Sequence, residues 1–234
     1  MLAGNAIIRL FILSLALLLA ACSLNRFERQ TQLYRIRAGE TLYAIAWRYQ
    51  LDFKTLAKWN GIKPPYVIHP GQKLVLVDPA RLPEEPQASK PGRKKPTRPS
   101  TSGKAHKPAP APKNFRWPTN GKVVRRFDGR KDGSQGIDIA GQLGQNIVSA
   151  GAGKVVYSGD GLVGYGNLII IKHNEDYLSA YAYNRVLLVK EGEVVKSGQK
   201  IAQMGQSQPG SPRLHFEIRR QGEPVNPLKY LPKR

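Results

Sequence analysis

Residues 153–183 read GKVVYSGDGLVGYGNLIIIKHNEDYLSAYAY, three runs rich in β-branched or aromatic residues separated by glycine-rich or polar breaks. Similar runs recur from residue 115 to residue 234, and turn-forming residues interrupt them about every 8–12 positions. This spacing is typical of an all-β domain, and no part of the block predicts a helix. The expected strands cover residues 122–125, 146–150, 153–159, 167–173, 177–183, 186–189, 200–205 and 214–220.

A different pattern occupies residues 34–77. Residues 34–37 alternate apolar and basic side chains, which predicts a short strand, and residues 73–77 predict another. Between them, Thr41 and Asp52 are suited to cap the amino ends of two helices. The expected order is strand, helix, helix, strand, a small α+β (βααβ) module. The apolar stripe of the first helix consists of Leu42, Ile45, Ala46 and Tyr49.

The two blocks are joined by a segment whose composition opposes folding. Residues 78–114 hold 9 of the 18 prolines, 9 Lys and Arg, 3 Asp and Glu, and no aromatic residue. Such a segment cannot bury enough apolar surface to offset the entropy lost on ordering it. We therefore expect a disordered linker between the domains.

The amino terminus predicts export. The 12-residue run over residues 10–21, apolar apart from Ser14, is too short for a membrane-spanning helix, which needs about 20 residues, but suits a signal peptide. Its end, Leu-Ala-Ala before Cys22, resembles the lipobox of bacterial lipoproteins. That resemblance implies cleavage before Cys22, acylation of Cys22 and, with Ser23 next, an outer-membrane location facing the periplasm. An ordinary signal peptide with an incidental cysteine is the alternative.

The chain is thus expected to be multidomain, with five segments in order. These are a signal peptide over 1–21, a polar tether over 22–33, the α+β module over 34–77, the disordered linker over 78–114 and the all-β domain over 115–234.

Charge and cysteine content limit the possible partners. With 37 Lys and Arg against 16 Asp and Glu, the formal net charge is +21, which favours nucleic acid, lipid head groups or cell-wall carboxylates. Export would keep the chain away from chromosomal DNA, so we expect no nucleic-acid partner. Because Cys22 is the single cysteine, internal disulfides and multi-cysteine metal sites are excluded.

The module over 34–77 resembles a LysM domain along its whole length, through the pattern YxIxxGETLxxIAxxYxxxxxxLxxxNxI…IxPGQxLxLV. The resemblance implies binding to the N-acetylglucosamine-containing glycan of peptidoglycan, in a groove between loops 38–42 and 60–66. The alternative is that these loop residues only shape the fold. The implied glycan-binding residues are Gly39, Glu40, Thr41, Asn60, Gly61, Ile62 and Tyr66.

The all-β block resembles the LytM, or lysostaphin-type, zinc endopeptidase domain, through phrases such as GYGNLIIIKH and LHFEIRRQGEPVNPLKYL. Active members of that family carry His-x-Gly-x-Asp, Tyr-Ala-His and His-x-His elements that hold zinc and perform catalysis. Here Ser134, Tyr183 and Arg213 stand where three of those histidines would be. Only Asp138 and His215 remain, so the resemblance implies a degenerate groove.

These replacements imply a domain that is not an enzyme and needs no cofactor. A catalytic zinc takes about three protein ligands and an open water position, and only two ligands remain. Arg213 and His215, two positions apart on one strand, share a face of it. We therefore expect Arg213 to replace the metal and to pair with Asp138; an Arg213 that faces solvent is the alternative.

Taken together, the lipobox, LysM module, linker and degenerate LytM domain resemble the NlpD-type outer-membrane lipoproteins. The resemblance implies non-catalytic activation of periplasmic N-acetylmuramoyl-L-alanine amidases in peptidoglycan hydrolysis and daughter-cell separation. The implied partners are peptidoglycan, an amidase and the membrane, through the lipid anchor. A passive peptidoglycan-tethering lipoprotein and an active zinc murein endopeptidase are the alternatives. The candidate amidase contacts are Tyr165, Tyr183 and Arg213.

Overall fold

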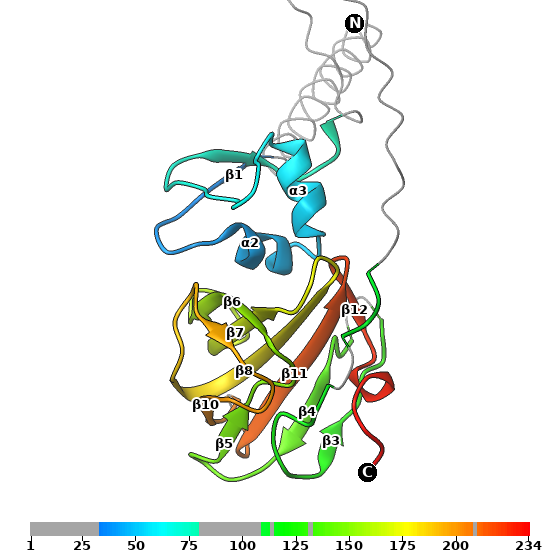
Figure 1. Ribbon diagram of the computed structural model, residues 1–234. Coiled ribbons are helices and arrows are strands. Elements are labelled where there is room, and N and C mark those ends of the chain that lie inside the picture. The colour runs from blue at the N-terminus through cyan, green and yellow to red at the C-terminus, as the bar shows by residue number, and fades with distance from the viewer. Residues whose placement is uncertain (1–32, 80–108, 113–114, 131–132, 208–209) are drawn as a thin grey trace, which may run out of the picture. The chain divides into compact units, whose positions relative to one another are not determined.

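The computed structural model describes residues 33–79, 109–112, 115–130, 133–207 and 210–234 (Figure 1). The expected signal peptide, Cys22, the tether before Leu33 and most of the linker lie outside these residues. No helix among the described residues is long and apolar enough to cross a bilayer.

The first block has the predicted order of elements: β1 (Leu33–Arg35), α2 (Leu42–Arg48), α3 (Phe53–Trp59) and β2 (Lys73–Val75). The two strands pair antiparallel with Tyr34 opposite Leu74. The predicted caps are confirmed: Thr41 Oγ1 accepts from Ala44 N at 3.1 Å, and Asp52 Oδ2 accepts from Thr55 N at 3.0 Å. Sequence alone therefore fixes where both helices begin.

The end of α2 differs from the prediction. Tyr49, assigned to the apolar stripe, lies after the last helical residue as the C-cap and is 41% exposed. Its backbone N–H still donates to Ile45 O. Because α2 is only seven residues long, the stripe ends before its fourth member.

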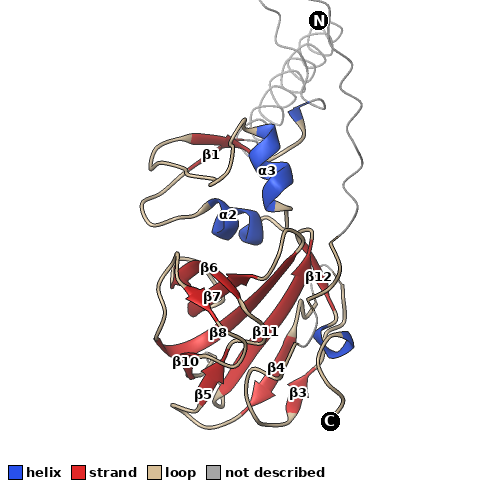
Figure 2. Ribbon diagram, in the orientation of Figure 1, coloured by secondary structure: helices blue, strands red, loops and turns tan. Residues whose placement is uncertain are grey.

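The second block is a single antiparallel sheet with strands in the order β3-β4-β11-β8-β7-β6-β9; β10 pairs with β5 and β8, and β12 pairs with β11 (Figures 1 and 2). The strands are β3 (Val123–Arg125), β4 (Ile137–Ala140), β5 (Asn146–Val148), β6 (Gly153–Gly159), β7 (Asn167–Lys172), β8 (Tyr177–Leu187), β9 (Val194–Val195), β10 (Lys200–Met204), β11 (Arg213–Arg220) and β12 (Glu223–Val225).

The all-β prediction is confirmed, with four local differences. The run 186–189 is not a separate strand, because β8 continues to Leu187 through its pairing with β10. The strands β4, β9 and β12 were not predicted: β4 carries a charged residue at its centre, and the other two have only two and three residues. Such strands exist because a longer neighbour, β11 or β6, supplies the pairing. The helical element described here is one 3-10 turn, η2 (Pro227–Lys229).

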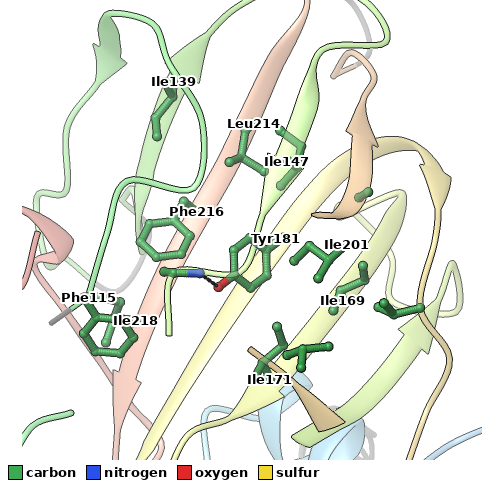
Figure 3. Packing of buried hydrophobic residues seen from close by; sticks show 14 of the residues in the cluster. Phe115, Ile139, Ile147, Ile169, Ile171, Tyr181, Ile201, Leu214, Phe216 and Ile218 are labelled. Atoms are coloured by element: carbon green, nitrogen blue, oxygen red, sulfur yellow. Dashed lines mark hydrogen bonds between the residues drawn. The ribbon is translucent and has the colours of Figure 1, made fainter. Parts of the chain in front are cut away.

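The core of the sheet domain is an aliphatic and aromatic cluster contributed by most of the strands (Figure 3). Fully burying one such aliphatic side chain contributes about 1.5–3 kcal/mol. Tyr181 brings a hydroxyl into this cluster and accepts a hydrogen bond from Ala150 N at 2.8 Å (Figure 3). Other members are Ile139, Ile147, Ile169, Ile171, Leu214, Phe216 and Ile218.

Two residues of the predicted linker, Ala109 and Pro110, have hydrogen-bond partners in the sheet domain. Ala109 N donates to the buried carboxylate of Asp176, and Pro110 O accepts from Asn174 Nδ2 at 3.1 Å. A buried carboxylate requires hydrogen-bond donors, and the linker backbone supplies one. Ala109 and Pro110 therefore lie against the turn between β7 and β8.

A hydrogen-bonded chain connects His173 with the core. Its Nδ1 lies 2.8 Å from Ala152 O and therefore carries the proton, and its Nε2 lies 2.7 Å from Ser179 Oγ. Ser179 Oγ lies 2.9 Å from Tyr181 OH. Burial lowers the pKa of His173 to about 4, against the smaller opposing effect of the Ala152 bond. His173 is therefore neutral in the folded domain at pH 7.

This neutral histidine predicts a loss of stability in mild acid. Between pH 6.5 and pH 4 the unfolded chain protonates His173 while the folded chain does not, so stability falls with falling pH by about 1.4 kcal/mol per unit. Above pH 6.5 the effect is absent. The measurement is the free energy of unfolding of the sheet domain against pH. The non-titrating His173→Gln variant should have a flatter curve in this window; an equal slope for both would contradict the prediction.

Candidate functional site

The pairing of β11 with its neighbours brings the predicted groove residues together. His215 lies opposite Asp138 of β4 on one side and opposite Ala182 of β8, the neighbour of Tyr183, on the other. Along β11, alternate side chains share one face of the sheet. That face carries a row of ionisable residues, Arg213, His215, Glu217 and Arg219.

His215 lies between two carboxylates. Its Nδ1 is 2.7 Å from Asp138 Oδ1, and its Nε2 is 3.1 Å from Glu217 Oε1. Burial by itself would lower the pKa of His215, but the hydrogen bonds to Asp138 and Glu217 outweigh it and raise the pKa to about 9. Both ring nitrogens therefore carry protons at pH 7, and the imidazolium has no free lone pair.

The expected pair between Arg213 and Asp138 is present, with Nη1 3.5 Å from Oδ2. The Asp138 side chain is 2% exposed, whereas that of Arg213 is 26% exposed. Burial would raise the pKa of Asp138, but the hydrogen bond and charge of His215, with Arg125 and Arg213, lower it below its usual range. The carboxylate is thus ionised and shared between two cations.

Glu217 completes the cluster, and sequence reasoning missed it. It is fully buried, accepts from Tyr165 OH at 2.8 Å on Oε1 and from Arg219 Nε at 3.0 Å on Oε2, and also pairs with His215. Burial would raise the pKa of Glu217, but Arg219 and then His215 lower it to about 2. The sequence pattern could have predicted it, because the two-residue alternation that places Arg213 and His215 on one face of the strand also includes Glu217 and Arg219.

The remaining predicted residues divide into two groups. The rings of Tyr183 and Tyr165 lie 5.7 Å and 6.1 Å from the His215 ring, so both belong to the cluster. Tyr183 also adopts a left-handed backbone, with φ of 63°. Ser134 is buried, but its hydroxyl donates to Gly136 O at 2.9 Å instead of to Asp138 or His215.

The side chains around His215 do not fit the zinc ion that active LytM-type peptidases hold. A histidine ligand offers a free ring nitrogen, whereas both ring nitrogens of His215 lie within hydrogen-bond distance of carboxylate oxygens, those of Asp138 and Glu217. The guanidinium of Arg213 lies against Asp138, and the Ser134 hydroxyl is committed to the backbone. Within the described parts of the chain, no group of three or more His, Cys, Asp or Glu is arranged to hold a metal ion.

In the first block, several predicted glycan-binding residues have structural partners. Asn60 uses its side-chain amide to hold β2: Nδ2 donates to Val75 O at 2.9 Å, and Oδ1 accepts from Val75 N at 2.7 Å. Glu40 pairs with Arg48 at 2.7 Å. The backbones of Gly39, Gly61 and Tyr66 have φ values of 77°, 65° and 65°, while Ile62 N donates to Ala57 O at 2.9 Å.

Comparison with known proteins matches each of the two blocks to a protein family. The LysM domain model matches residues 34–77, and the Peptidase family M23 model matches residues 132–227. The chain is 46% identical over 229 residues to Lipoprotein NlpD/LppB homolog of Pseudomonas aeruginosa, covering 86% of this chain and 77% of that protein.

Two Escherichia coli proteins show similar likeness. The chain is 42% identical over 228 residues to Uncharacterized lipoprotein YgeR, covering 94% of this chain and 91% of the relative. It is 39% identical over 260 residues to Murein hydrolase activator NlpD, covering 86% of this chain and 68% of that relative. With a LysM domain, an M23 domain and these relatives, the chain belongs to the NlpD/LppB family of lipoproteins.

Proposed function

We propose that this chain is a non-catalytic activator of periplasmic N-acetylmuramoyl-L-alanine amidases, acting on peptidoglycan hydrolysis in daughter-cell separation. The observation that carries the proposal is the ionic row on β11. Where a zinc peptidase needs a neutral histidine and an open metal position, His215 is bonded to Asp138 and Glu217, and Arg213 covers Asp138. A relative of the chain is named a murein hydrolase activator, which agrees with this role.

The chemistry of the cluster supports a binding role. A protonated His215 cannot act as a general base. Tyr183 and Arg213 stand where active LytM members carry their two catalytic histidines. The cluster instead offers a partner a cation, Arg213, and two aromatic rings that lie beside His215, those of Tyr165 and Tyr183.

The other segments of the chain suggest where the proposed activator is located in the cell envelope. Acylation of Cys22 would anchor the chain in the outer membrane on its periplasmic side, in agreement with the lipoprotein names of its relatives. The LysM domain would hold the peptidoglycan glycan, with Ile62 and Tyr66 as candidate ring contacts. Asn60 and Gly61 would act by shaping the loop.

The test is dye release from labelled sacculi. The chain alone should release no dye, an amidase alone little, and the two together much more. Stimulation that is absent while the chain still sediments with sacculi would favour a passive tether. Dye release by the chain alone that a chelator stops would overturn the proposal in favour of a zinc endopeptidase.

A further inference from the structure

A groove of about 1000 Å³ lies on the sheet domain beside the ionic row and separate from it. Its walls come from the segment before β3, the end of β4 and the start of β5. Ala140, one of the lining residues, is the register partner of Arg213, but no member of the ionic row lines the groove. The side chains used below are Arg116, Trp117, Asn120, Lys122, Gln142 and Asn146.

The groove is shaped by close approaches that leave no space for a side chain. Gly121 has a φ of 134°, and a Cβ there would lie 1.8 Å from Ala140 O. A Cβ on Gly198 would lie 2.0 Å from Arg116 Nη1. Both glycines line the groove; at Gly121 the close neighbour is the backbone of β4, and at Gly198 it is the side chain of Arg116.

Hydrogen bonds inside the domain hold the same walls. Gln145 Nε2 donates to Thr119 Oγ1 and to Asn120 O, both at 2.8 Å. The Arg234 guanidinium lies 3.8 Å from the Trp117 ring centre and donates to Thr119 O at 2.7 Å. A ligand would therefore meet a preformed site, which reduces the entropy lost on binding.

The exposed side chains that line this groove are cationic or carry amides. Arg116 and Lys122 are exposed, and no lining residue carries a carboxylate. The exposed side chains of Asn120, Gln142 and Asn146 add amides that can both donate and accept. The cations suit carboxylates, and the amides suit sugar hydroxyls, N-acetyl groups and peptide bonds.

We propose that this groove is a second peptidoglycan site, which binds the stem peptide of a muropeptide through its carboxylates. It would let the sheet domain contact the wall independently of the LysM domain. The inference does not depend on amidase activation, because none of the residues assigned to amidase contact lines the groove.

The experiment is an NMR titration of the folded chain with a soluble disaccharide–tetrapeptide. The chain has three tryptophans, so its indole N–H signals are few, and Trp117→Phe identifies the one in the groove. Trp117 Nε1 donates to Pro232 O at 2.9 Å, which gives its signal a defined environment. The muropeptide should shift this signal saturably, whereas an N-acetylglucosamine tetramer, which has no carboxylate, should not.

Charge reversal provides the second measurement. Arg116→Glu with Lys122→Glu should weaken muropeptide binding at the Trp117 signal about tenfold or more. The matched control is Lys190→Glu, an exposed lysine outside the groove, which should leave the affinity unchanged. Retained indole shifts of the free variants show that they fold.

Three outcomes would overturn the inference. The first is a Trp117 signal that stays unmoved at muropeptide saturation of the LysM domain. The second is an equal response to inorganic phosphate or to anionic phospholipid vesicles, which would identify a general anion site. The third is unchanged affinity in the folded double variant. An Asn120→Ala variant with weaker muropeptide binding would add support without altering charge.

Discussion

Replacement of Glu217 by alanine is expected to destabilise the M23 domain by about 3–5 kcal/mol, a large share of the stability of an ordinary domain. Glu217 is fully buried and bonds His215, Tyr165 and Arg219. Its removal leaves two cations without this counter-charge and the Tyr165 hydroxyl without its acceptor. The measurement is chemical denaturation followed by a signal of the sheet domain, such as the indole N–H resonance of Trp117 in NMR spectra.

Two comparisons make the Glu217 prediction specific. Glu217→Gln keeps an acceptor for Tyr165 but removes the charge, so its loss of stability should be smaller than that of alanine. Glu223→Ala, at an exposed position on β12, should change stability by no more than about 0.5 kcal/mol. If Glu217→Ala were no more destabilising than Glu223→Ala, the ionic row would not contribute to stability as described.

Arg213→Ala and Tyr183→Ala are each expected to weaken amidase activation, with about 30-fold lower affinity for the amidase if either residue is a binding hot spot. Arg213 is the partly exposed end of the row, and Tyr183 lies beside His215. Removing Arg213 leaves Asp138 paired with His215, so the fold should persist. The measurement is amidase-dependent dye release across a titration of each variant.

The control for this pair is Lys154→Ala, an exposed cation on β6, a strand that pairs with neither β4 nor β11. It should activate like the unmodified chain. Normal activation by folded Arg213→Ala and Tyr183→Ala would place the amidase contact elsewhere. Loss of activation in all three variants would indicate a general effect of charge or handling instead of a contact.

The sequence by itself determined the class of both blocks, the two helices and the longer strands. Thr41 and Asp52 define helix starts because a side-chain oxygen at the N-cap satisfies a backbone N–H a few residues away, a local interaction. The long strands β6, β7 and β11 were predictable because their apolar runs are bounded by turn residues. The Arg213–Asp138 pair was predictable because Arg213 shares a face with His215.

The tertiary structure decided what depends on distant neighbours. The strands β4, β9 and β12 are too short for their sequence pattern to predict them. They exist because they pair with longer strands. The protonation of His215 could not be read from the sequence, because it needs Asp138, 77 positions away, and Glu217 on opposite sides of one ring. Likewise, the groove exists only after β4 and the segment before β3 pack together, which brings Gly121 close to the backbone of Ala140.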